Sequence, residues 1–416
     1  MTRKKAGIAL ALLLLSAAWC SGQQAPDWPR FRGPDGSGVS TETAWNPRAL
    51  AGNPRILWTA NVGIGLSNFS AQGDRLFTMG WKDHQDSVMC LDVSSGKEIW
   101  RYSYPRATVD PYGTQTTPVI DGEYLYALGN HGESFCLGTA DGALLWKKNI
   151  VTDYKAFYPV HNFGASPVID GDLLLLNAND SGIALDKRTG NLVWNSSATV
   201  TADLSVQSYA TPTLDDVNGS RCALLFAGLG LYSVEVKTGK VDWFFSWDMG
   251  SVLNVATPVR FENKVLISSA EVGLGTLLDM AGDKPAVLWQ NDSMRIHTNA
   301  SVYIDGCLYG CCGDAGGGYP TSLRCVDAGS GEVKWEQRMK LSSVTGAAGR
   351  LIILDESGKL RIAETTPTAY TEISSWQLPT SFLPKWWTPP LLYRGRIYCR
   401  NLMGELVCID VSSESE

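Results

Sequence analysis

Short stretches in which apolar and polar positions alternate recur along most of the chain, separated by turn residues. The clearest unit is "TTPVIDGEYLYALGNHGESFCLGTADGALLWKK", residues 116–148, and related units begin near residues 165, 210, 256 and 300. Each unit holds four runs of strand-forming residues, with an Asp-Gly type of turn after the first run and a Gly-containing turn before the last. The pattern therefore predicts a repeated sheet of four antiparallel strands.

A tryptophan in the last run of each unit sets the length of the repeat. Eight of the 15 tryptophans recur at intervals of 41 to 49 residues: Trp58, Trp100, Trp146, Trp194, Trp243, Trp289, Trp335 and Trp376. A four-stranded unit cannot bury both of its faces alone, so neighbouring copies must pack against each other. Units of this length and strand content are typical of propeller blades, and the sequence predicts an all-β, eight-bladed β-propeller.

The two ends of the chain complement each other in this pattern. The last unit stops at Glu416, where its tryptophan strand should begin, whereas "NPRILWTANVG" carries Trp58 with no unit before it. An N-terminal strand that completes the last blade would close the ring and remove the open sheet edges. We therefore expect one propeller domain over residues 45–416.

The residues before the propeller fall into two segments. Basic residues 3–5 precede a short apolar run and several small residues, which is typical of an export signal, and we expect this signal to span residues 1–22. The apolar run is too short to cross a bilayer, so a secreted or periplasmic protein is expected. Residues 23–44, with the amphipathic Trp28 and Phe31, are expected to form an irregular arm that lies across the propeller.

Cys20 offers an alternative end to the export signal, because a lipid-modified cysteine begins the mature chain of a lipoprotein. The bulky Trp19 directly before it is unfavourable for such a signal. We therefore favour ordinary cleavage between Ala18 and Ala25 over a lipid anchor.

The charge of the chain excludes two classes of partner. The formal net charge is -7, from 42 acidic and 35 basic residues, and no stretch concentrates the basic residues. Nucleic acids and anionic lipid surfaces attract strongly basic proteins, so neither is an expected partner.

A nine-residue motif surrounds the tryptophan in several units. It reads "DVSSGKEIW" from Asp92, "DKRTGNLVW" from Asp186 and "DAGSGEVKW" from Asp327, and "EVKTGKVDW" from Glu235 keeps the pattern with Glu in place of Asp. These residues resemble the docking motif of the pyrroloquinoline quinone (PQQ)-binding-like, quinoprotein-type eight-bladed propellers. The resemblance covers about residues 45–411 and implies that the eight tryptophans wedge between blades. The turns before Trp289 and Trp376 are longer, and Gly138 replaces the Asp before Trp146.

Within that family the chain is most similar to the noncatalytic branch typified by the outer-membrane-protein assembly factor BamB, a periplasmic scaffold of similar length. This resemblance implies a scaffold that binds a protein or polymer partner in the cell envelope and needs no cofactor. Fold alone does not name the function, because the same family contains dehydrogenases.

The alternative is an oxidoreductase that depends on PQQ and Ca²⁺. The family's enzymes stack the quinone on a vicinal disulfide, and "LYGCCGDAGGGYP" contains the neighbouring Cys311 and Cys312. Glu271, Asp314 and Asn254 are the nearest candidates for Ca²⁺ ligands or a base, but nothing in their spacing selects them. We therefore favour a strained loop disulfide or two free thiols at the end of a second strand in the sixth blade.

Cys399 and Cys408 form one specific candidate pair among the nine cysteines beyond Cys20. They flank "RNLMGELV", and a two-residue turn at Met403 and Gly404 would place them opposite each other on a hairpin. The alternative is that both are small apolar residues of the core.

A ring of polar side chains is expected at the mouth of the central channel, because these residues directly precede the first strand of each unit. They are Asn68, Gln115, His161, Asn162, Gln207, Asn254, His297 and Asn299. Such a ring could bind a small polar ligand or a peptide by several hydrogen bonds. The alternative, which we favour, is that they satisfy exposed backbone groups at strand ends.

Aromatic residues outside the repeat position suggest a third function, a carbohydrate-binding module. The candidates are Trp81, Phe157, Tyr158, Trp247, Trp386 and Trp387, with burial between blades or under loops as the favoured alternative. The four histidines, His84, His131, His161 and His297, lack the spacing of metal ligands. A noncatalytic envelope scaffold remains the leading prediction, followed by the quinone enzyme and the carbohydrate-binding module.

Overall fold

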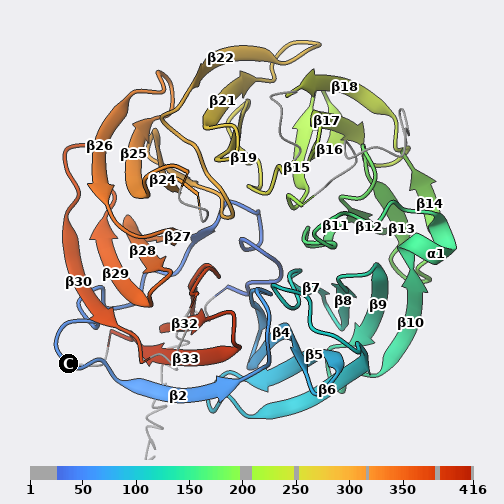
Figure 1. Ribbon diagram of the computed structural model, residues 1–416, viewed down its shortest axis with the longest axis horizontal. Helices are drawn as coiled ribbons and strands as arrows, with labels where there is room; N and C mark the ends of the chain where they lie inside the picture. Colours follow the sequence, from blue (N-terminus) through green and yellow to red (C-terminus); the bar gives the residue numbers. More distant parts are fainter. Residues whose placement is uncertain (1–25, 197–208, 248–252, 315–317, 380–384, 414–416) are drawn as a thin grey trace, which may run out of the picture.

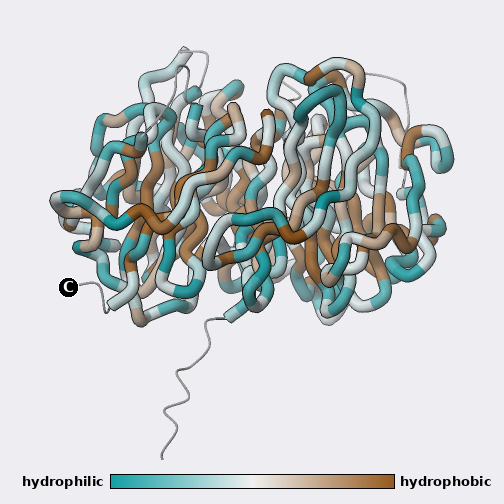
Figure 2. The backbone as a smooth tube through the Cα atoms, turned by 90° about the horizontal axis from the view of Figure 1, so that it is seen from below, coloured by the Kyte–Doolittle hydropathy of each residue, from teal (hydrophilic) through white to brown (hydrophobic). Residues whose placement is uncertain are grey.

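The computed structural model describes residues 26–196, 209–247, 253–314, 318–379 and 385–413 of the chain. Within these residues, eight antiparallel sheets surround a central axis as the blades of a propeller, with one short helix, α1 (Ile150–Tyr154) (Figure 1). The predicted all-β, eight-bladed propeller is therefore confirmed. Seen from the side in Figure 2, the ring is a disc whose apolar stretches lie mainly within its thickness and whose polar stretches gather at the loops.

The blades follow one another around the ring in chain order, and each runs from an inner first strand to an outer fourth strand. Blades 1 to 4 consist of β3 (Ser70–Gln72), β4 (Arg75–Lys82), β5 (Gln85–Asp92) and β6 (Glu98–Pro105); β7 (Val119–Asp121), β8 (Tyr124–Leu128), β9 (Glu133–Gly138) and β10 (Leu144–Asn149); β11 (Val168–Asp170), β12 (Leu173–Leu176), β13 (Ile183–Asp186) and β14 (Leu192–Asn195); and β15 (Thr213–Val217), β16 (Ser220–Ala227), β17 (Gly230–Glu235) and β18 (Val241–Ser246). Blades 5 to 7 consist of β19 (Val259–Phe261), β20 (Lys264–Ser269), β21 (Leu274–Asp279) and β22 (Ala286–Asn291); β23 (Val302–Ile304), β24 (Cys307–Cys312), β25 (Ser322–Asp327) and β26 (Val333–Arg338); and β27 (Ser342–Ala347), β28 (Arg350–Asp355), β29 (Lys359–Glu364) and β30 (Glu372–Gln377).

The eighth blade joins the two ends of the chain. It contains β31 (Leu391–Tyr393), β32 (Arg396–Arg400) and β33 (Glu405–Asp410), and β2 (Ile56–Asn61) pairs antiparallel with β33 as its outer strand. Trp58 lies opposite Cys408 in this pairing. The N-terminal strand therefore closes the ring as the sequence pattern predicted.

Seven of the eight tryptophans lie between neighbouring blades, where only 6 to 9% of their surface is exposed. In six of them the indole N–H donates to a backbone carbonyl of the following blade at 2.7 to 3.0 Å, at Trp58, Trp100, Trp146, Trp194, Trp289 and Trp335. At five of them the indole also covers the motif glycine of that blade, at Trp58, Trp100, Trp146, Trp194 and Trp289. At Gly239, which has φ +76°, a Cβ atom would lie 2.6 Å from Trp194. These five interfaces therefore require both a large indole and a residue without a side chain.

In blade 7 the docking position belongs to Ser374, and the prediction for Trp376 is wrong. In the other blades the ladder shifts register immediately before the docking tryptophan, and in blade 7 that shift precedes Ser374. Trp376 lies two residues farther along β30. The Ser374 hydroxyl donates to the Pro47 carbonyl at 2.6 Å, and Trp45 of the same N-terminal segment packs between blades 7 and 8. The spacing of the tryptophans does not show that a serine occupies the docking position of blade 7, because the turn before β30 is longer than in the other blades.

Four cysteines share one repeat position, on the third strand opposite a docking tryptophan: Cys90, Cys136, Cys325 and Cys408. All four are buried and free. A small apolar side chain at this position leaves room for the indole. Packing against the docking tryptophan therefore accounts for the presence of a cysteine at this position in four blades.

Cys399 and Cys408 do not lie opposite each other, which contradicts the predicted cross-strand pair. Cys399 is opposite Val407 and Cys408 is opposite Tyr398. The two side chains therefore point to opposite faces of the blade, Cys399 toward blade 7 and Cys408 toward blade 1. The register differs from the prediction because four residues, 401–404, connect β32 and β33 where a two-residue turn was assumed.

The segment before the propeller crosses the central channel (Figure 1). Trp28 exchanges two backbone hydrogen bonds with Ala71 of blade 1, at 2.9 and 2.8 Å. The Arg32 guanidinium donates to the carbonyls of Ala300 and Ser301 beside blade 6, and β1 (Val39–Ser40) adds a parallel strand to β27 of blade 7. The arm therefore fills part of the channel and ties together blades that are distant in sequence.

Replacing one docking tryptophan is expected to destabilise the ring far more than replacing Trp376. Trp194→Ala removes an indole buried between two blades, and such truncations cost about 3–5 kcal/mol. Trp376→Ala removes a partly buried side chain at a non-docking position and is expected to cost about 1 kcal/mol. Urea unfolding followed by circular dichroism measures both. Equal losses for the two variants would contradict the assignment of the docking position in blade 7.

Candidate binding site at the channel mouth

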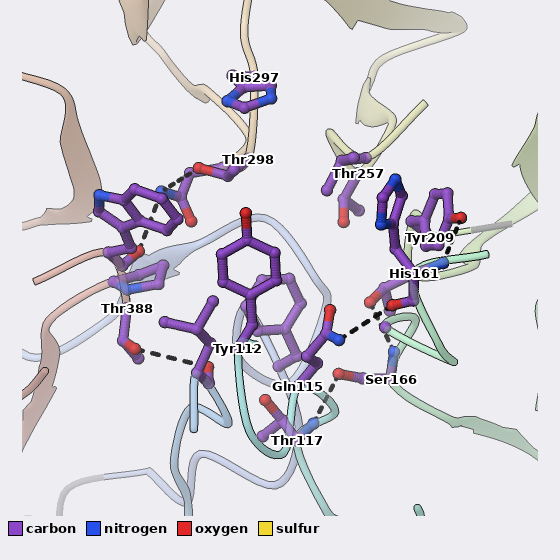
Figure 3. Close-up of a pocket in the computed structure, with 18 of the residues that line it drawn as sticks. Tyr112, Gln115, Thr117, His161, Ser166, Tyr209, Thr257, His297, Thr298 and Thr388 are labelled. Carbon is purple, nitrogen blue, oxygen red and sulfur yellow. Dashed lines mark hydrogen bonds between the residues drawn. The ribbon is translucent and has the colours of Figure 1, made fainter. Parts of the chain in front are cut away.

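A cavity of about 420 Å³ opens at the end of the central channel where the fourth strand of each blade connects to the first strand of the next (Figure 3). Its lining residues come from all of these connections except the one that enters blade 7, together with Glu271 from the loop between β20 and β21 and Phe31 from the N-terminal arm. Because residues from so many blades converge here, the cavity depends on the closed ring. We take this cavity as the candidate functional site and call it the channel-mouth cavity.

Four of the polar residues predicted at the channel mouth line the cavity: Gln115, His161, His297 and Asn299. The Gln115 amide donates to the His161 carbonyl at 3.1 Å, which connects blades 2 and 3 (Figure 3). The Asn299 amide donates to the Ser343 hydroxyl at 2.8 Å and to the Trp387 carbonyl at 3.1 Å. The amide side chains at this mouth therefore hold neighbouring connections together.

The other described members of the predicted ring do not line the cavity. Asn254 is fully buried, and its amide donates to the carbonyls of Ala227 and Gly228 at 2.8 and 3.2 Å. Asn68 is buried beside the first strand of blade 1, and Asn162 accepts a hydrogen bond from the Tyr158 hydroxyl. Gln207 lies outside the described residues. For Asn254 the structure thus shows backbone satisfaction, which was the alternative to ligand binding.

A series of hydroxyl groups in the cavity wall was not predicted. The Thr117 hydroxyl accepts a hydrogen bond from the Asn68 backbone N–H at 3.1 Å, the Ser166 hydroxyl accepts one from the Thr117 N–H at 2.9 Å, and the Thr211 hydroxyl accepts one from the Ser166 N–H at 3.1 Å. Each bond joins one blade to the next at the same repeat position. The sequence signal is a Thr or Ser before proline in four successive units, at Thr117, Ser166, Thr211 and Thr257.

Charged and aromatic groups surround the rim of the cavity. The His297 imidazole lies 3.3 Å from the Glu271 carboxylate, measured from Nε2 to Oε1. The Lys385 ammonium lies 4.8 Å from the centre of the Trp387 ring, and Tyr112 packs against that ring at 6.0 Å between centroids. The rim therefore combines the Lys385 cation and the Glu271 carboxylate with aromatic surface, which suits a ligand that is partly polar and partly apolar.

Cys311 and Cys312 end β24, as the repeat register predicted, and both are buried free thiols. Their side chains point to opposite faces of the blade. Cys311 packs against Trp387 but does not line the cavity, and Cys312 packs toward blade 5 with Met294. Burial raises the pKa of Cys311 to about 12 and that of Cys312 to about 11, so both thiols stay protonated at neutral pH.

The residues present do not fit the quinone site of the family's enzymes. The three candidate Ca²⁺ groups are separate: Glu271 faces His297, Asn254 faces backbone carbonyls, and Asp314 accepts from the Gly318 N–H. Within the described parts of the chain, no group of three or more His, Cys, Asp or Glu side chains is arranged to hold a metal ion. The cysteine pair also offers no disulfide surface to the cavity.

Three of the six residues of the candidate aromatic platform are buried, and Trp81 and Phe157 are partly buried. Trp247 and Trp386 expose 1% or less of their surface and Trp387 exposes 9%. Tyr158 is exposed, at 44%, and lies edge-on to His131 at 5.1 Å between ring centroids. The tryptophans therefore stabilise loops and blade contacts, and none of these three presents the broad exposed face on which a sugar ring stacks.

A buried charge network fixes the long loop between β6 and β7, which carries Tyr112. The Arg106 guanidinium donates to Asp86 at 3.2 Å and to Glu133 at 3.1 Å, and it also contacts His131. His131 Nε2 lies 3.4 Å from the Asp110 carboxylate. Burial raises the pKa of Asp86 to about 6, although the Arg106 guanidinium opposes this shift.

The stability of this loop anchor is expected to depend on pH through Asp86. Since the pKa of Asp86 is higher in the folded chain than the value of about 4 in an unfolded chain, its contribution to folding is fully present below pH 4 and is lost as pH rises through 6. Between pH 5 and pH 7 the unfolding free energy of the wild type should therefore fall by about 1–2 kcal/mol more than that of Asp86→Asn. Thermal unfolding across this range measures the difference. Asp283→Asn, at an exposed position, is the matched control and should follow the wild type.

Comparison with known proteins agrees with this architecture. The chain matches the family described as outer membrane protein assembly factor BamB over residues 84–337. The outer membrane protein assembly factor BamB of Yersinia pestis is 21% identical over 366 residues, which are 85% of this chain and 78% of that protein.

Two solved structures share the fold at low sequence identity. BamB from Moraxella catarrhalis superposes with a TM-score of 0.62 at 14% identity, covering 86% of this chain and 98% of that chain. Quinohemoprotein alcohol dehydrogenase from Comamonas testosteroni superposes with a TM-score of 0.67 at 11% identity, covering 94% of this chain and 81% of that chain. The fold is thus common to both types of protein. Because the family match spans more than half of its residues, the chain belongs to the outer membrane protein assembly factor BamB family.

Proposed function

We propose that the chain is a noncatalytic propeller scaffold that binds a protein partner in the periplasm or cell envelope. Membership of the BamB family supports a protein partner, since the relatives are described as assembly factors of outer membrane proteins. The binding surface is the face around the channel-mouth cavity. The export signal expected over residues 1–22 would deliver the chain to that compartment; this segment and Cys20 lie outside the described residues.

The observation that carries this proposal is a group of exposed apolar side chains beside the cavity. Val109 and Tyr112 on the loop between β6 and β7 are 38% and 37% exposed, and Tyr158 and Val160 on the connection between blades 2 and 3 are 44% and 60% exposed. The two connections are linked through His131, which contacts both Tyr158 and Asp110. Exposed apolar side chains that gather on neighbouring loops are typical of a protein-protein interface.

The surface differs from the outer rim of the propeller, where exposed aliphatic residues also occur. On the rim they flank the docking tryptophans along the fourth strands, as Val287 does on β22 with 50% exposure. At the channel mouth they lie on long connections, next to a concave site with hydrogen-bonding groups. Interfaces need both apolar area and a shaped, polar-lined centre, and this combination favours the channel mouth.

The two alternative functions have less support. A quinone enzyme requires a cofactor pocket that the cysteine pair and the three candidate Ca²⁺ groups do not form. A carbohydrate-binding module requires exposed aromatic faces, whereas Trp247 and Trp386 are buried.

Within the described residues, the structure contains no helix long and apolar enough to cross a membrane.

A photo-crosslinking amino acid at position 160 is expected to capture a partner, whereas the same residue at position 287 is not. Both positions hold an exposed valine, so the pair is matched in side chain and exposure. The experiment is performed in intact cells that produce the full chain, with crosslinked products identified by mass spectrometry. Tyr112→Asp is expected to reduce crosslinking from position 160 at least tenfold, because it places a charge within the proposed binding surface.

Two results would overturn the proposal. One is equal crosslinking to the same products from positions 160 and 287, which would place binding on no particular face. The other is saturable binding of PQQ together with dye-linked oxidation of alcohols or sugars, which would establish the oxidoreductase.

A further inference from the structure

The hydroxyl groups of the cavity wall form their hydrogen bonds in the same direction around the ring. Those of Thr117, Ser166 and Thr211 each accept a hydrogen bond from a backbone N–H of the preceding blade. Each side chain is at least nine-tenths buried, and each lines the channel-mouth cavity, where Figure 3 labels Thr117 and Ser166. A hydroxyl that has accepted a hydrogen bond still has one O–H to donate. Within the described part of the chain, these three hydroxyls donate no hydrogen bond.

Thr257 continues the series in blade 5 without any hydrogen bond to the described residues. It is buried to about nine-tenths, lines the cavity, and points toward it in Figure 3. Four consecutive blades therefore direct O–H donors to one wall of the cavity. A ligand with acceptor atoms could accept hydrogen bonds from these O–H groups without breaking a hydrogen bond between the described residues.

The charged groups at the rim reinforce the preference for acceptors. Lys385 contributes a cation, His161 and His297 contribute imidazoles, and Glu271 is the one carboxylate among the described lining residues. That carboxylate already faces His297 at 3.3 Å. The one carboxylate of the lining thus already faces a histidine, whereas Lys385 forms no ion pair with the described residues, in a chain whose net charge is -7.

The remaining lining is apolar. Phe31 and Leu66 contribute apolar side chains, and Tyr112 and Tyr209 contribute aromatic rings. A ligand that fits this cavity therefore carries a compact group of acceptor atoms on an apolar body. A carboxylate has two acceptor oxygens with about four lone-pair sites, which matches several converging O–H donors.

We propose that the channel-mouth cavity binds a carboxylate attached to an apolar body, held by the hydroxyls of Thr117, Ser166, Thr211 and Thr257. Two sources share this chemistry: the C-terminal carboxylate of a polypeptide and a free small carboxylic acid. The proposal rests on the proposed binding function and names the group that the partner, or a small ligand at the same site, inserts into the cavity.

Three probes test the chemistry by isothermal titration calorimetry on the intact protein. They are N-acetyl-alanyl-leucine, its C-terminal amide, and 4-methylpentanoate. The free-acid dipeptide is expected to bind at least tenfold more tightly than the amide, because only the acid presents two charged acceptor oxygens. Tighter binding of the dipeptide acid than of 4-methylpentanoate indicates a polypeptide terminus, and equal binding indicates a small acid; either result supports the carboxylate site.

Thr257→Val is the most informative variant, since it removes the hydroxyl with little change in shape and breaks no hydrogen bond within the described residues. Its affinity for the free acid is expected to fall about tenfold. Thr257→Ser restores the hydroxyl and should restore affinity, whereas a merely steric role would not produce this rescue. Thr59→Val, at an exposed position on β2, is the matched control and should bind as the wild type does.

Equal affinity for acid and amide, or no binding of any probe to the folded wild type, would overturn the carboxylate proposal. Retention of full affinity in Thr257→Val would overturn the assigned role of that hydroxyl. These outcomes are separate from the crosslinking test, because crosslinking from position 160 reports partner binding whatever group enters the cavity.

Discussion

The packing of an indole against a glycine between neighbouring blades is the interaction on which the rest of the structure depends. A four-stranded blade has two apolar faces, and both must be covered by other blades. The docking tryptophan covers the motif turn of the next blade, and its N–H satisfies a backbone carbonyl there, as at Trp194 and Val236. Small residues beneath the indole, such as Cys136, complete the fit. Repetition of this contact fixes the angle between blades and therefore the radius of the ring.

The same ring is stabilised near its axis by different interactions. Hydroxyl groups connect the inner strands of blades 1 to 4, and the N-terminal arm reaches blade 1 through Trp28 and the neighbourhood of blade 6 through Arg32. The interactions near the axis leave a cavity at one end of the channel. Because the docking contacts lie on the outside and the cavity lies at the centre, residues at the mouth can vary without loss of the blade interfaces. This separation explains how one fold supports both scaffolds and dehydrogenases.

Features governed by local repetition could be predicted from the sequence, and features governed by register could not. The strand-forming runs, the docking tryptophans and the unpaired strand around Trp58 determined the blade count and the closure of the ring. Trp376 was misassigned because a longer turn moved the docking position to Ser374, and Cys399 was misassigned because a four-residue connection changed its partner. A shift of one residue reverses the face to which a strand side chain points, and periodicity alone does not detect such a shift.

The sequence predicted where the channel mouth lies, but it did not predict which side chains line it. Polar amides and imidazoles before each first strand indicated the site, yet Asn254 turns inward to backbone carbonyls whereas Thr257 faces the cavity. Residues three positions apart can thus have opposite roles, because the connection changes direction as it enters the inner strand. Cys311 illustrates the same constraint: it lies close to the cavity in space, but Trp387 packs against it and lines the cavity in its place. Which side chains line the mouth therefore depends on the direction of each connection. That direction is defined only in the assembled ring.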